Sequence, residues 1–221
     1  KSSYKLQKND KIIIYNINFS VNKNKKKIEK YKASRKELSS TIFVEDNANF
    51  SVIDKPAGIA VQSGTYSRKN VLDILRDTKE FYNKTPFSVH RIDKETTGIL
   101  LVAKNREYAK LFTSLFRLRK IHKTYLAIVI GEVQKNKGTF TDVLTYYEGK
   151  KIIKSKAITH FTVINSNINY SLLRLNPVTG RKHQIRKQLL IHGHPVLGDN
   201  KYRLIDSRPN KKNLLMLHAY K

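Results

Sequence analysis

The sequence predicts an α+β fold whose main element is a mixed, mainly antiparallel sheet. Short apolar runs rich in β-branched residues recur between turn residues, and this pattern is typical of strands. Only a few segments show the periodicity of an amphipathic helix. These helices do not alternate regularly with the strands, as they would in a doubly wound parallel sheet. The chain is therefore expected to place a few helices against one sheet.

Most of the expected elements end at residues that break regular structure. Proline and glycine mark the turns at 54–58 and 177–180, and Gly131 marks another. The helix over 106–119 is the clearest, because its apolar residues gather near one face. The remaining predicted elements are helices over 71–81 and 181–191 and strands over 11–15, 50–53, 88–92, 99–103, 124–130, 139–144, 152–164, 170–175 and 214–218.

The chain divides into three regions of different composition. Residues 1–20 suggest a short β unit, and residues 21–40 are crowded with lysine and hold few acids. Such blocks of like charge are usually solvated, so 21–40 is expected to be a basic linker. Residues 41–221 carry the apolar pattern of a packed domain and are expected to form one.

The chain is strongly basic. Its 221 residues contain 44 Lys and Arg against 17 Asp and Glu, which gives a formal net charge of +27. A surplus of this size attracts polyanions, and RNA is the expected partner. Lys, Asn and Ile are all encoded by A/T-rich codons, so genome composition is an alternative source of part of this charge.

The composition also argues against several kinds of site. The chain has no cysteine, which excludes disulfides, thiolate zinc sites and a cysteine nucleophile. No apolar run approaches the ~18 residues of a membrane span, so no membrane partner is expected. Glycine-rich nucleotide-binding patterns are missing, and no cofactor is expected. His183, His192 and His194 lack the spacing of a ligand set, so no metal is expected either.

Residues 90–98 hold the most distinctive candidate for catalysis. Asp93 follows Arg91 by two positions, precedes a Thr-Thr-Gly turn, and is followed by the apolar run 99–103. Catalytic side chains are often mounted at such a junction between a loop and a rigid strand. An aspartate before this kind of turn can equally cap it, so the local pattern leaves both roles open.

Four segments, in order, resemble the RluA-type pseudouridine synthase family. They are 54–61, 90–98, 123–131 and 175–186, similar to the family's [ND]-K-P-x-G-x-x-V, H-R-[LI]-D-x-x-[TS]-[TS]-G, K-x-Y-x-A-x-V-x-G and L-x-P-x-T-G-R-x-H-Q-[IL]-R segments. Residues 193–199 and 217–219 fit the family's tail, so the resemblance covers about residues 42–220. It implies a bent sheet with flanking helices around a central basic cleft. It also implies isomerisation of uridine to pseudouridine in RNA, without cofactor or metal.

The resemblance assigns the catalytic roles. It implies that Asp93 is the essential carboxylate and that Arg186 forms an ion pair with it. It further implies that Tyr125 packs against the flipped uracil and assists proton transfer. A guanidinium beside Asp93 would orient the carboxylate and keep it ionised. From the residues alone, Tyr125 could be an ordinary packing tyrosine and Arg186 an exposed cation.

The resemblance also suggests which residues contact RNA. The target uridine must leave its stack, and Arg91 is expected to fill the vacated space. Ile185 is expected to form an apolar floor under the base, or to belong to the ordinary core. The other expected RNA contacts are Arg181, His183 and Lys55, which lie in the matching segments. The sequence departs from the family at Gln188, where many relatives have histidine, and this affects hydrogen bonding behind the site.

The resemblance is strongest to the RluC-like branch, which modifies large-subunit ribosomal RNA, and residues 1–20 look like the end of an S4 RNA-binding domain. Structured RNA, above all ribosomal RNA, is therefore the expected partner, and a tRNA-directed synthase is the alternative. A non-catalytic ribosome-assembly factor is a second alternative. A metal-dependent nuclease is disfavoured because the sequence lacks a carboxylate cluster. The protein is expected to be a monomer in the bacterial cytoplasm or in an organelle of bacterial origin.

Overall fold

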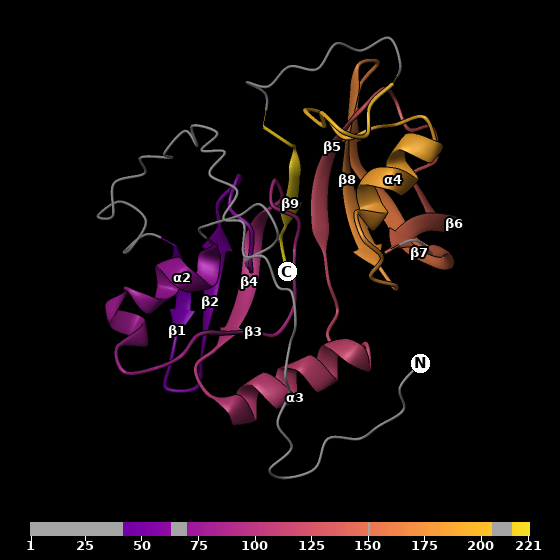
Figure 1. The fold of residues 1–221 in the computed structure, drawn as a ribbon. Coiled ribbons are helices and arrows are strands. Elements are labelled where there is room, and N and C mark those ends of the chain that lie inside the picture. Colours follow the sequence, from indigo (N-terminus) through magenta and orange to yellow (C-terminus); the bar gives the residue numbers. More distant parts are fainter. Residues whose placement is uncertain (1–41, 63–69, 150, 205–213) are drawn as a thin grey trace, which may run out of the picture. The chain divides into compact units, whose positions relative to one another are not determined.

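A computed structural model describes residues 42–62, 70–149, 151–204 and 214–221. The predicted S4 remnant at 1–20 and the predicted linker at 21–40 lie outside the described residues. Within the described residues, the strands form one sheet in the order β1-β2-β4-β9-β5-β8-β7-β6, and β3 pairs with β4 (Figure 1). The pairs are antiparallel except for β4 with β9, so the predicted α+β class with a mixed, mainly antiparallel sheet is confirmed.

The strands are those that the apolar alternation favours, with side chains pointing in turn to the core and away from it. In β4, for example, Leu100 and Val102 are buried and Leu101 is only partly covered. The strands are β1 Phe43–Asp46, β2 Phe50–Lys55, β3 Phe87–Ser88, β4 Thr97–Ala103, β5 Tyr125–Ile130, β6 Lys137–Glu148, β7 Lys151–Ser166, β8 Tyr170–Pro177 and β9 Leu217–Ala219.

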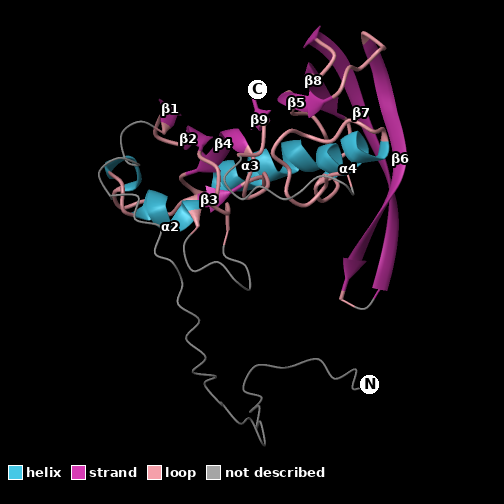
Figure 2. Cartoon of the chain, turned by 90° about the horizontal axis from the view of Figure 1, so that it is seen from above, coloured by secondary structure: helices cyan, strands magenta, loops and turns pink. Residues whose placement is uncertain are grey.

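The helices lie on one side of the row of strands (Figure 2). They are α2 Val71–Arg76, α3 Arg106–Arg117 and α4 Gln184–Ile191, with a short 3-10 turn at Lys79–Phe81. Asn70 and Asn105 cap α2 and α3, because each side-chain oxygen accepts a hydrogen bond from an amide in the first turn.

Two apolar cores fill the space beneath the two halves of the sheet. One joins α2 to β2 and β4 and contains Ile42, Ile53, Val61, Val71, Leu75, Phe81, Leu100 and Val102. The other joins α4 to β5, β8 and their neighbours and contains Ala127, Val129, Val133, Phe140, Phe161, Leu173, Leu175, Ile185, Leu189, Val196, Leu215 and Leu217. Burial of these side chains is the main driving force that fixes each helix to its half of the sheet.

Strand β9 joins the two halves. It pairs with β4 on one side and β5 on the other, and Ala219 stands opposite both Gly98 and Tyr125 (Figure 1). The approach is close at Gly98, where φ is +104° and an added Cβ would lie 2.8 Å from the amide nitrogen of Ala219. Only glycine fits this position without a shift of the backbone.

Two predicted elements differ from the structure near the site. The predicted strand 88–92 pairs only as far as Ser88, because the amide of Leu101 donates to Nε2 of His90 at 2.9 Å instead of to a strand carbonyl. The predicted helix 181–191 begins at Gln184, because His183 has a left-handed backbone with φ 53° that a helix cannot include. Both differences place residues of the matching segments in loops.

Other boundaries also differ from the prediction. The segment predicted as one helix over 71–81 is divided, and its second half is the 3-10 turn. The strands predicted at 139–144 and 152–164 are longer and form the β6–β7 hairpin. The last strand begins at Leu217 rather than at residue 214, because the amide of Met216 bonds to the carbonyl of Leu197, outside the sheet.

Candidate active site

A pocket of about 350 Å³ lies where the two halves of the sheet meet. Its walls come from the loop before β4, the end of α3, the start of β5, and the segment that leads into α4. Seven of the eight predicted site residues line it, and only Lys55 does not. The lining contains Arg91, Asp93, Tyr125, Arg181, His183, Ile185 and Arg186, together with His90, Ile92, Thr96, Phe116, Lys123, Pro177, Thr179, Gly180, Gln184 and Leu217.

Asp93 presents its carboxylate to this pocket. The turn that follows is closed by the backbone, since the amide of Thr96 donates to the carbonyl of Asp93 at 3.1 Å. The side chain keeps 26% of its surface exposed, and its Oδ2 lies 3.4 Å from Nη1 of Arg186. Its Oδ1 lies 3.7 Å from Nε2 of His183. The carboxylate therefore faces a guanidinium and an imidazole, and the backbone bond makes a side-chain cap of this turn unnecessary.

Arg186 contacts Asp93 as the resemblance implied, but its main partner is Asp199. Nε and Nη2 of Arg186 each lie 2.7 Å from an oxygen of Asp199, whose side chain is fully buried. This two-bond arrangement fixes the plane of the guanidinium and leaves Nη1 directed at Asp93. Asp199 was not among the site residues predicted from the sequence. The sequence offered one signal for it: an acidic residue directly after the glycine-containing turn 193–198, with no basic residue following it until Lys201.

The ionisation of this group of charges follows from its contacts. Burial alone would lower the pKa of Arg186, but the hydrogen bonds and charge of Asp199, with the charge of Asp93, outweigh burial and raise it. Burial would raise the pKa of Asp199, but Arg186 and the amides of Tyr202 and Lys201 outweigh burial and lower it. Both groups are therefore charged at neutral pH, so the pocket keeps a cation fixed beside Asp93.

His183 lies beside Asp93 and contacts Tyr202, a residue that the sequence analysis did not identify. Nδ1 of His183 lies 2.8 Å from the hydroxyl of Tyr202, and the two rings meet edge to face. The Tyr202 ring also lies against the guanidinium of Arg186, with its centre 5.0 Å from Cζ. The predicted RNA contact of His183 remains a prediction, but this geometry favours a role behind the carboxylate.

Tyr125 begins β5 and forms part of the pocket wall. Burial, helped by the charge of Asp93, raises the pKa of its hydroxyl to about 12. The hydroxyl is therefore protonated at neutral pH and can donate a hydrogen bond to a bound base. This protonation state limits the predicted assistance to proton transfer, because a phenol with this pKa is a poor base at neutral pH.

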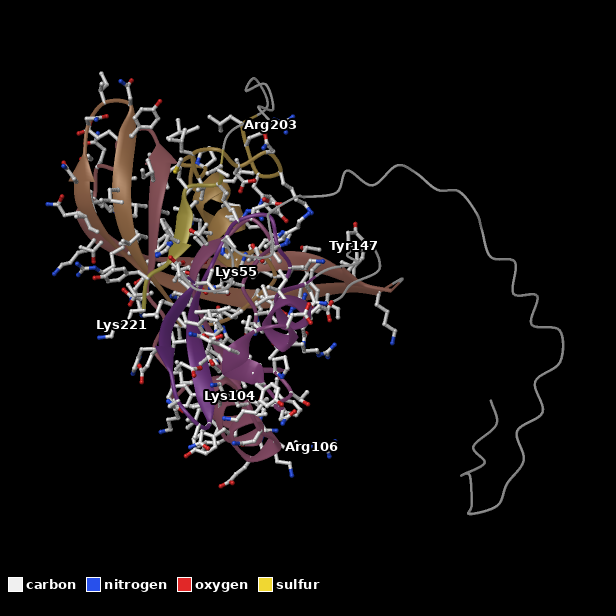
Figure 3. The ribbon with its side chains drawn as sticks, turned by 90° about the vertical axis from the view of Figure 1, so that its left-hand side faces the viewer. Lys55, Lys104, Arg106, Tyr147, Arg203 and Lys221 are labelled. Carbon is white, nitrogen blue, oxygen red and sulfur yellow. The ribbon has the colours of Figure 1, made fainter. Side chains whose placement is uncertain are left out.

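Lys55 does not contact the pocket, and its predicted contact with RNA needs correction. The residue is 0% exposed, and its Nζ donates to the carbonyls of Pro56, Ile59 and Lys94. Burial lowers its pKa to about 8, and nearby acidic side chains, Glu95 and Asp93 first, oppose that effect. All three donors of the ammonium are used within the protein, so Lys55 ties the end of β2 to the loop that carries Asp93. Its label in Figure 3 marks this position.

The other predicted RNA contacts differ in how they are held. Arg91 is exposed at the pocket, as a side chain that reaches for RNA requires. Nε of Arg181 donates to the carbonyl of Lys156 at 3.2 Å, which leaves its other nitrogens for a ligand. Ile185 is buried in the α4 core and also lines the pocket, so both roles considered for it hold together.

His90 and Lys123 also line the pocket, although the sequence analysis gave them no role. Burial, with a smaller effect from the charge of Lys123, lowers the pKa of His90 to about 4. The ring is stacked on Phe116 with 4.4 Å between ring centres, so neutral His90 stiffens the loop before Asp93. Burial first, and the charge of Arg119 second, lowers the pKa of Lys123.

Gln188, where the sequence departs from many relatives, is fully buried behind the pocket. Its amide nitrogen donates to Asp142 and to the carbonyl of Ala157, and its oxygen accepts from Thr159. The hydroxyl of Thr159 also accepts from Gln184, which lines the pocket. Glutamine therefore completes a hydrogen-bonded path from the pocket wall to β6.

Across the described segments, 42–62, 70–149, 151–204 and 214–221, no three His, Cys, Asp or Glu side chains gather in a way suited to a metal ion. In the same part of the chain, no helix has the length and apolar composition needed to cross a membrane.

Comparisons with known proteins agree with this geometry. Residues 49–190 match the profile of a family described as RNA pseudouridylate synthase. A Haemophilus influenzae relative named ribosomal large subunit pseudouridine synthase C is 33% identical over 232 residues, covering 100% of this chain and 71% of the relative. A Haemophilus ducreyi relative named tRNA pseudouridine synthase C is 33% identical over 192 residues, covering 76% of this chain and 78% of the relative.

A solved structure supports the same assignment. The structure of human RNA pseudouridylate synthase domain containing 4 matches with a TM-score of 0.68 and 25% identity, and the match covers 80% of this chain and 81% of that chain. The family match includes Asp93, Tyr125 and Arg186. On sequence, fold and site together, the chain belongs to the RNA pseudouridylate synthase family.

Proposed function

We propose that the protein isomerises uridine to pseudouridine in large-subunit ribosomal RNA, with Asp93 as the catalytic residue. The observation that carries this proposal is the position of the Asp93 carboxylate in a basic pocket, with Arg186 at 3.4 Å. The name of the Haemophilus influenzae relative supports ribosomal RNA as the substrate. We propose a monomer as the active unit, because Asp93, Tyr125 and Arg186 line one pocket within a single copy of the chain.

The reaction rearranges one nucleoside without net gain or loss of atoms. The N1–C1′ bond breaks, the uracil rotates, and a C5–C1′ bond forms. The proton on C5 then leaves, and N1 gains a proton. Breaking the N1–C1′ bond develops positive charge on the sugar, and a carboxylate beside C1′ stabilises that charge. The reaction therefore needs one fixed carboxylate in a pocket large enough for a base and its ribose, and Asp93 has this position.

An ionised Asp93 can act in two ways. Its oxygen can attack C1′ and form a covalent bond to the sugar, or it can accept the C2′ proton so that uracil leaves by elimination. Both routes need a carboxylate that is charged and correctly oriented. The Arg186 guanidinium, itself fixed by Asp199, supports both requirements.

The pocket walls suit a uracil that must turn between two bonds. Ile185 offers an apolar surface that does not hydrogen-bond the base in one orientation. Tyr125 offers a flat ring and a protonated hydroxyl, because its pKa is raised to about 12, first by burial and then by the charge of Asp93. We propose that Tyr125 packs on the uracil and donates to one of its oxygens, and that the proton on C5 goes to another acceptor.

Basic side chains around the pocket suit a folded RNA. Arg91 is exposed beside Asp93, and we propose that it occupies the space left by the flipped uridine.

The β6–β7 hairpin projects as an arm and carries Tyr147, which is 75% exposed (Figures 2 and 3). The exposed arm face, defined by Val143, Tyr147, Ile152, Lys154 and Lys156, combines an aromatic ring with lysines, a combination that suits stacking on unpaired bases and contact with phosphates.

The test is turnover on defined RNAs that carry tritium at C5 of uridine. Purified protein is incubated with transcripts of large-subunit ribosomal RNA and of tRNA, and tritium release is followed by mapping of the pseudouridines. The proposal predicts release from ribosomal RNA that is lost in Asp93→Asn. Release from tRNA alone would identify tRNA as the substrate, which is the alternative that the name of the Haemophilus ducreyi relative supports. Binding without release from any RNA would indicate a non-catalytic assembly factor.

A further inference from the structure

We propose that Tyr202 is a positioning residue that sets the tautomer of His183, so that His183 presents an N–H group to the Asp93 carboxylate. The catalytic consequence of this inference rests on the proposed function, whereas the tautomer itself does not. The inference adds two side chains to the Asp93–Arg186 pair and gives each a defined hydrogen-bonding role.

Tyr202 is held in a fixed position by Asp199 and Arg186. The amides of Lys201 and Tyr202 both donate to Oδ1 of Asp199 at 2.9 Å, so the buried carboxylate that holds Arg186 also holds this backbone. The ring of Tyr202 lies against Arg186, with 5.0 Å from its centre to Cζ. Asp199 thus fixes both the guanidinium and the ring that covers it, and the hydroxyl has a defined position.

The second step is the fixed position of His183. Its left-handed backbone, with φ 53°, precedes α4 and directs the ring into the pocket instead of along the helix. One ring nitrogen, Nδ1, lies 2.8 Å from the Tyr202 hydroxyl. The other, Nε2, lies 3.7 Å from Oδ1 of Asp93. The imidazole therefore stands between a hydroxyl and a carboxylate.

The third step is the choice between the two neutral tautomers. If Nδ1 carried the proton, the lone pair of Nε2 would face the negative Oδ1 of Asp93, which is repulsive. If Nε2 carries the proton, its N–H dipole points at the carboxylate, and Nδ1 accepts from the Tyr202 hydroxyl. The second arrangement satisfies every partner, so the geometry selects the Nε2–H form.

Burial, together with the net effect of the surrounding charges, lowers the pKa of His183 and favours a neutral ring at neutral pH. Burial lowers its pKa most, the charge of Asp93 opposes that effect, and the charges of Arg186, Lys201 and Lys182 lower it further, with a net decrease. Burial also raises the pKa of Tyr202, so its hydroxyl retains the proton that it donates to Nδ1. A neutral His183 ring that lies between the donor hydroxyl of Tyr202 and the acceptor carboxylate of Asp93 therefore carries its proton on Nε2.

The consequence is that both oxygens of Asp93 are oriented. Arg186 holds Oδ2, and the N–H of His183 faces Oδ1. A separation of 3.7 Å is longer than a hydrogen bond, so in the RNA-free state the N–H acts through its dipole. Loss of the Tyr202 hydroxyl would free His183 to change tautomer, and the carboxylate would lose the second of its two orienting partners.

The experiment compares the wild type with Tyr202→Phe, which keeps the ring against Arg186 and removes only the hydroxyl. Nitrogen-15 NMR of histidine-labelled protein, assigned with His183→Ala, reports which ring nitrogen is protonated. The wild type is expected to show Nε2–H and an unprotonated Nδ1 for His183, and the variant a mixture of both tautomers. Tyr220→Phe, which removes an exposed hydroxyl at the end of the chain, is the matched control and should leave the signals unchanged.

Single-turnover kinetics give the second measurement. Tyr202→Phe should lower the rate of the chemical step about tenfold, the lower end of the ~10–100-fold loss known for partners that orient metal-bound histidines, with RNA affinity nearly unchanged. In a His183→Ala background the same substitution should have no further effect, because Tyr202 acts through His183. Additive losses, or a wild-type signal from Nδ1–H, would overturn the inference. If the wild type makes no pseudouridine on any RNA, the proposed function fails, and the NMR comparison still decides the tautomer.

Discussion

At the residue scale, the pocket depends on one arginine that is shared by two carboxylates of different character. Asp199 is buried and binds Arg186 through two short bonds, whereas Asp93 is partly exposed and binds it through one longer contact. The sequence predicted the Asp93–Arg186 pair because both residues lie in recognisable segments. Asp199 was missed because its partner, the guanidinium of Arg186, is brought beside it only by the fold.

Asp199→Asn should therefore inactivate the enzyme through Arg186. The asparagine cannot accept two charge-assisted bonds, so the guanidinium loses its fixed plane and Asp93 its orientation. Removal of one partner from a buried pair costs roughly 3–5 kcal/mol of stability, which urea unfolding would measure. Asp77→Asn, at an exposed carboxylate after α2, is the control and should be almost neutral in stability and turnover. Full turnover in Asp199→Asn would show that Arg186 does not need this partner.

His90 should give the protein a distinct dependence on pH. Its pKa is lowered to about 4, first by burial, so the unfolded chain binds a proton below its ordinary pKa of 6.5 while the folded chain does not. The stabilisation is fully present above pH 6.5 and is lost as pH falls toward 4, up to about 3 kcal/mol in total. His90→Gln keeps an acceptor for Leu101 but cannot titrate. The difference in unfolding free energy between wild type and variant should change over this interval, and a constant difference would contradict the account.

At the element scale, the sequence predicted regular structure well and loop geometry poorly. The helix over 106–119 and most strands were predicted because their apolar periodicity is local information. The early end of β3 was not predictable, since it depends on His90 accepting from an amide of β4. The late start of α4 depends on a left-handed His183, which no pattern in the sequence marks. The length of the β6–β7 arm was underestimated because polar residues alternate along it with few apolar ones.

The arm should contribute to RNA affinity through its lysines. Lys154→Gln with Lys156→Gln removes two positive charges from the exposed arm face, which is the proposed contact. If both contact phosphates, the slope of log affinity against log salt should become less steep by about 1.5. Lys79→Gln with Lys84→Gln removes the same number of exposed positive charges from the half of the domain that contains α2 and should leave the slope nearly unchanged. Equal effects in the two pairs would mean that only total charge matters.

At the scale of the whole described domain, the site lies at the joint between two separately packed halves. Each half has its own core, and the short strand β9 bonds to both. Asp93 comes just before β4, Tyr125 opens β5, and Arg186 lies on α4, so the joint brings them together. The order of the strands was not predictable from the sequence, because it depends on pairings between distant residues. The fold class was predictable, because it depends mainly on composition and local pattern.

Gly98→Ala should weaken the protein at this joint. An added methyl group would collide with the backbone of Ala219, and φ at this position is +104°. Gly193→Ala is the matched control, because Gly193 also has a positive φ, +81°, but open space around its Cβ position. Strain at φ alone costs of order 1–3 kcal/mol. A loss of stability and turnover in Gly98→Ala clearly beyond that of Gly193→Ala is expected, and equal losses would show that the close approach to β9 is unimportant.

We propose that the Asp93 carboxylate performs the chemistry and contributes little to binding. The most direct test is Asp93→Asn, which keeps the shape of the side chain and removes its charge. Tritium release from C5-labelled large-subunit ribosomal RNA and RNA affinity are measured on the same preparation. The account predicts no detectable release with affinity within about threefold of the wild type, because binding comes mainly from phosphate contacts. Normal release by Asp93→Asn would contradict it.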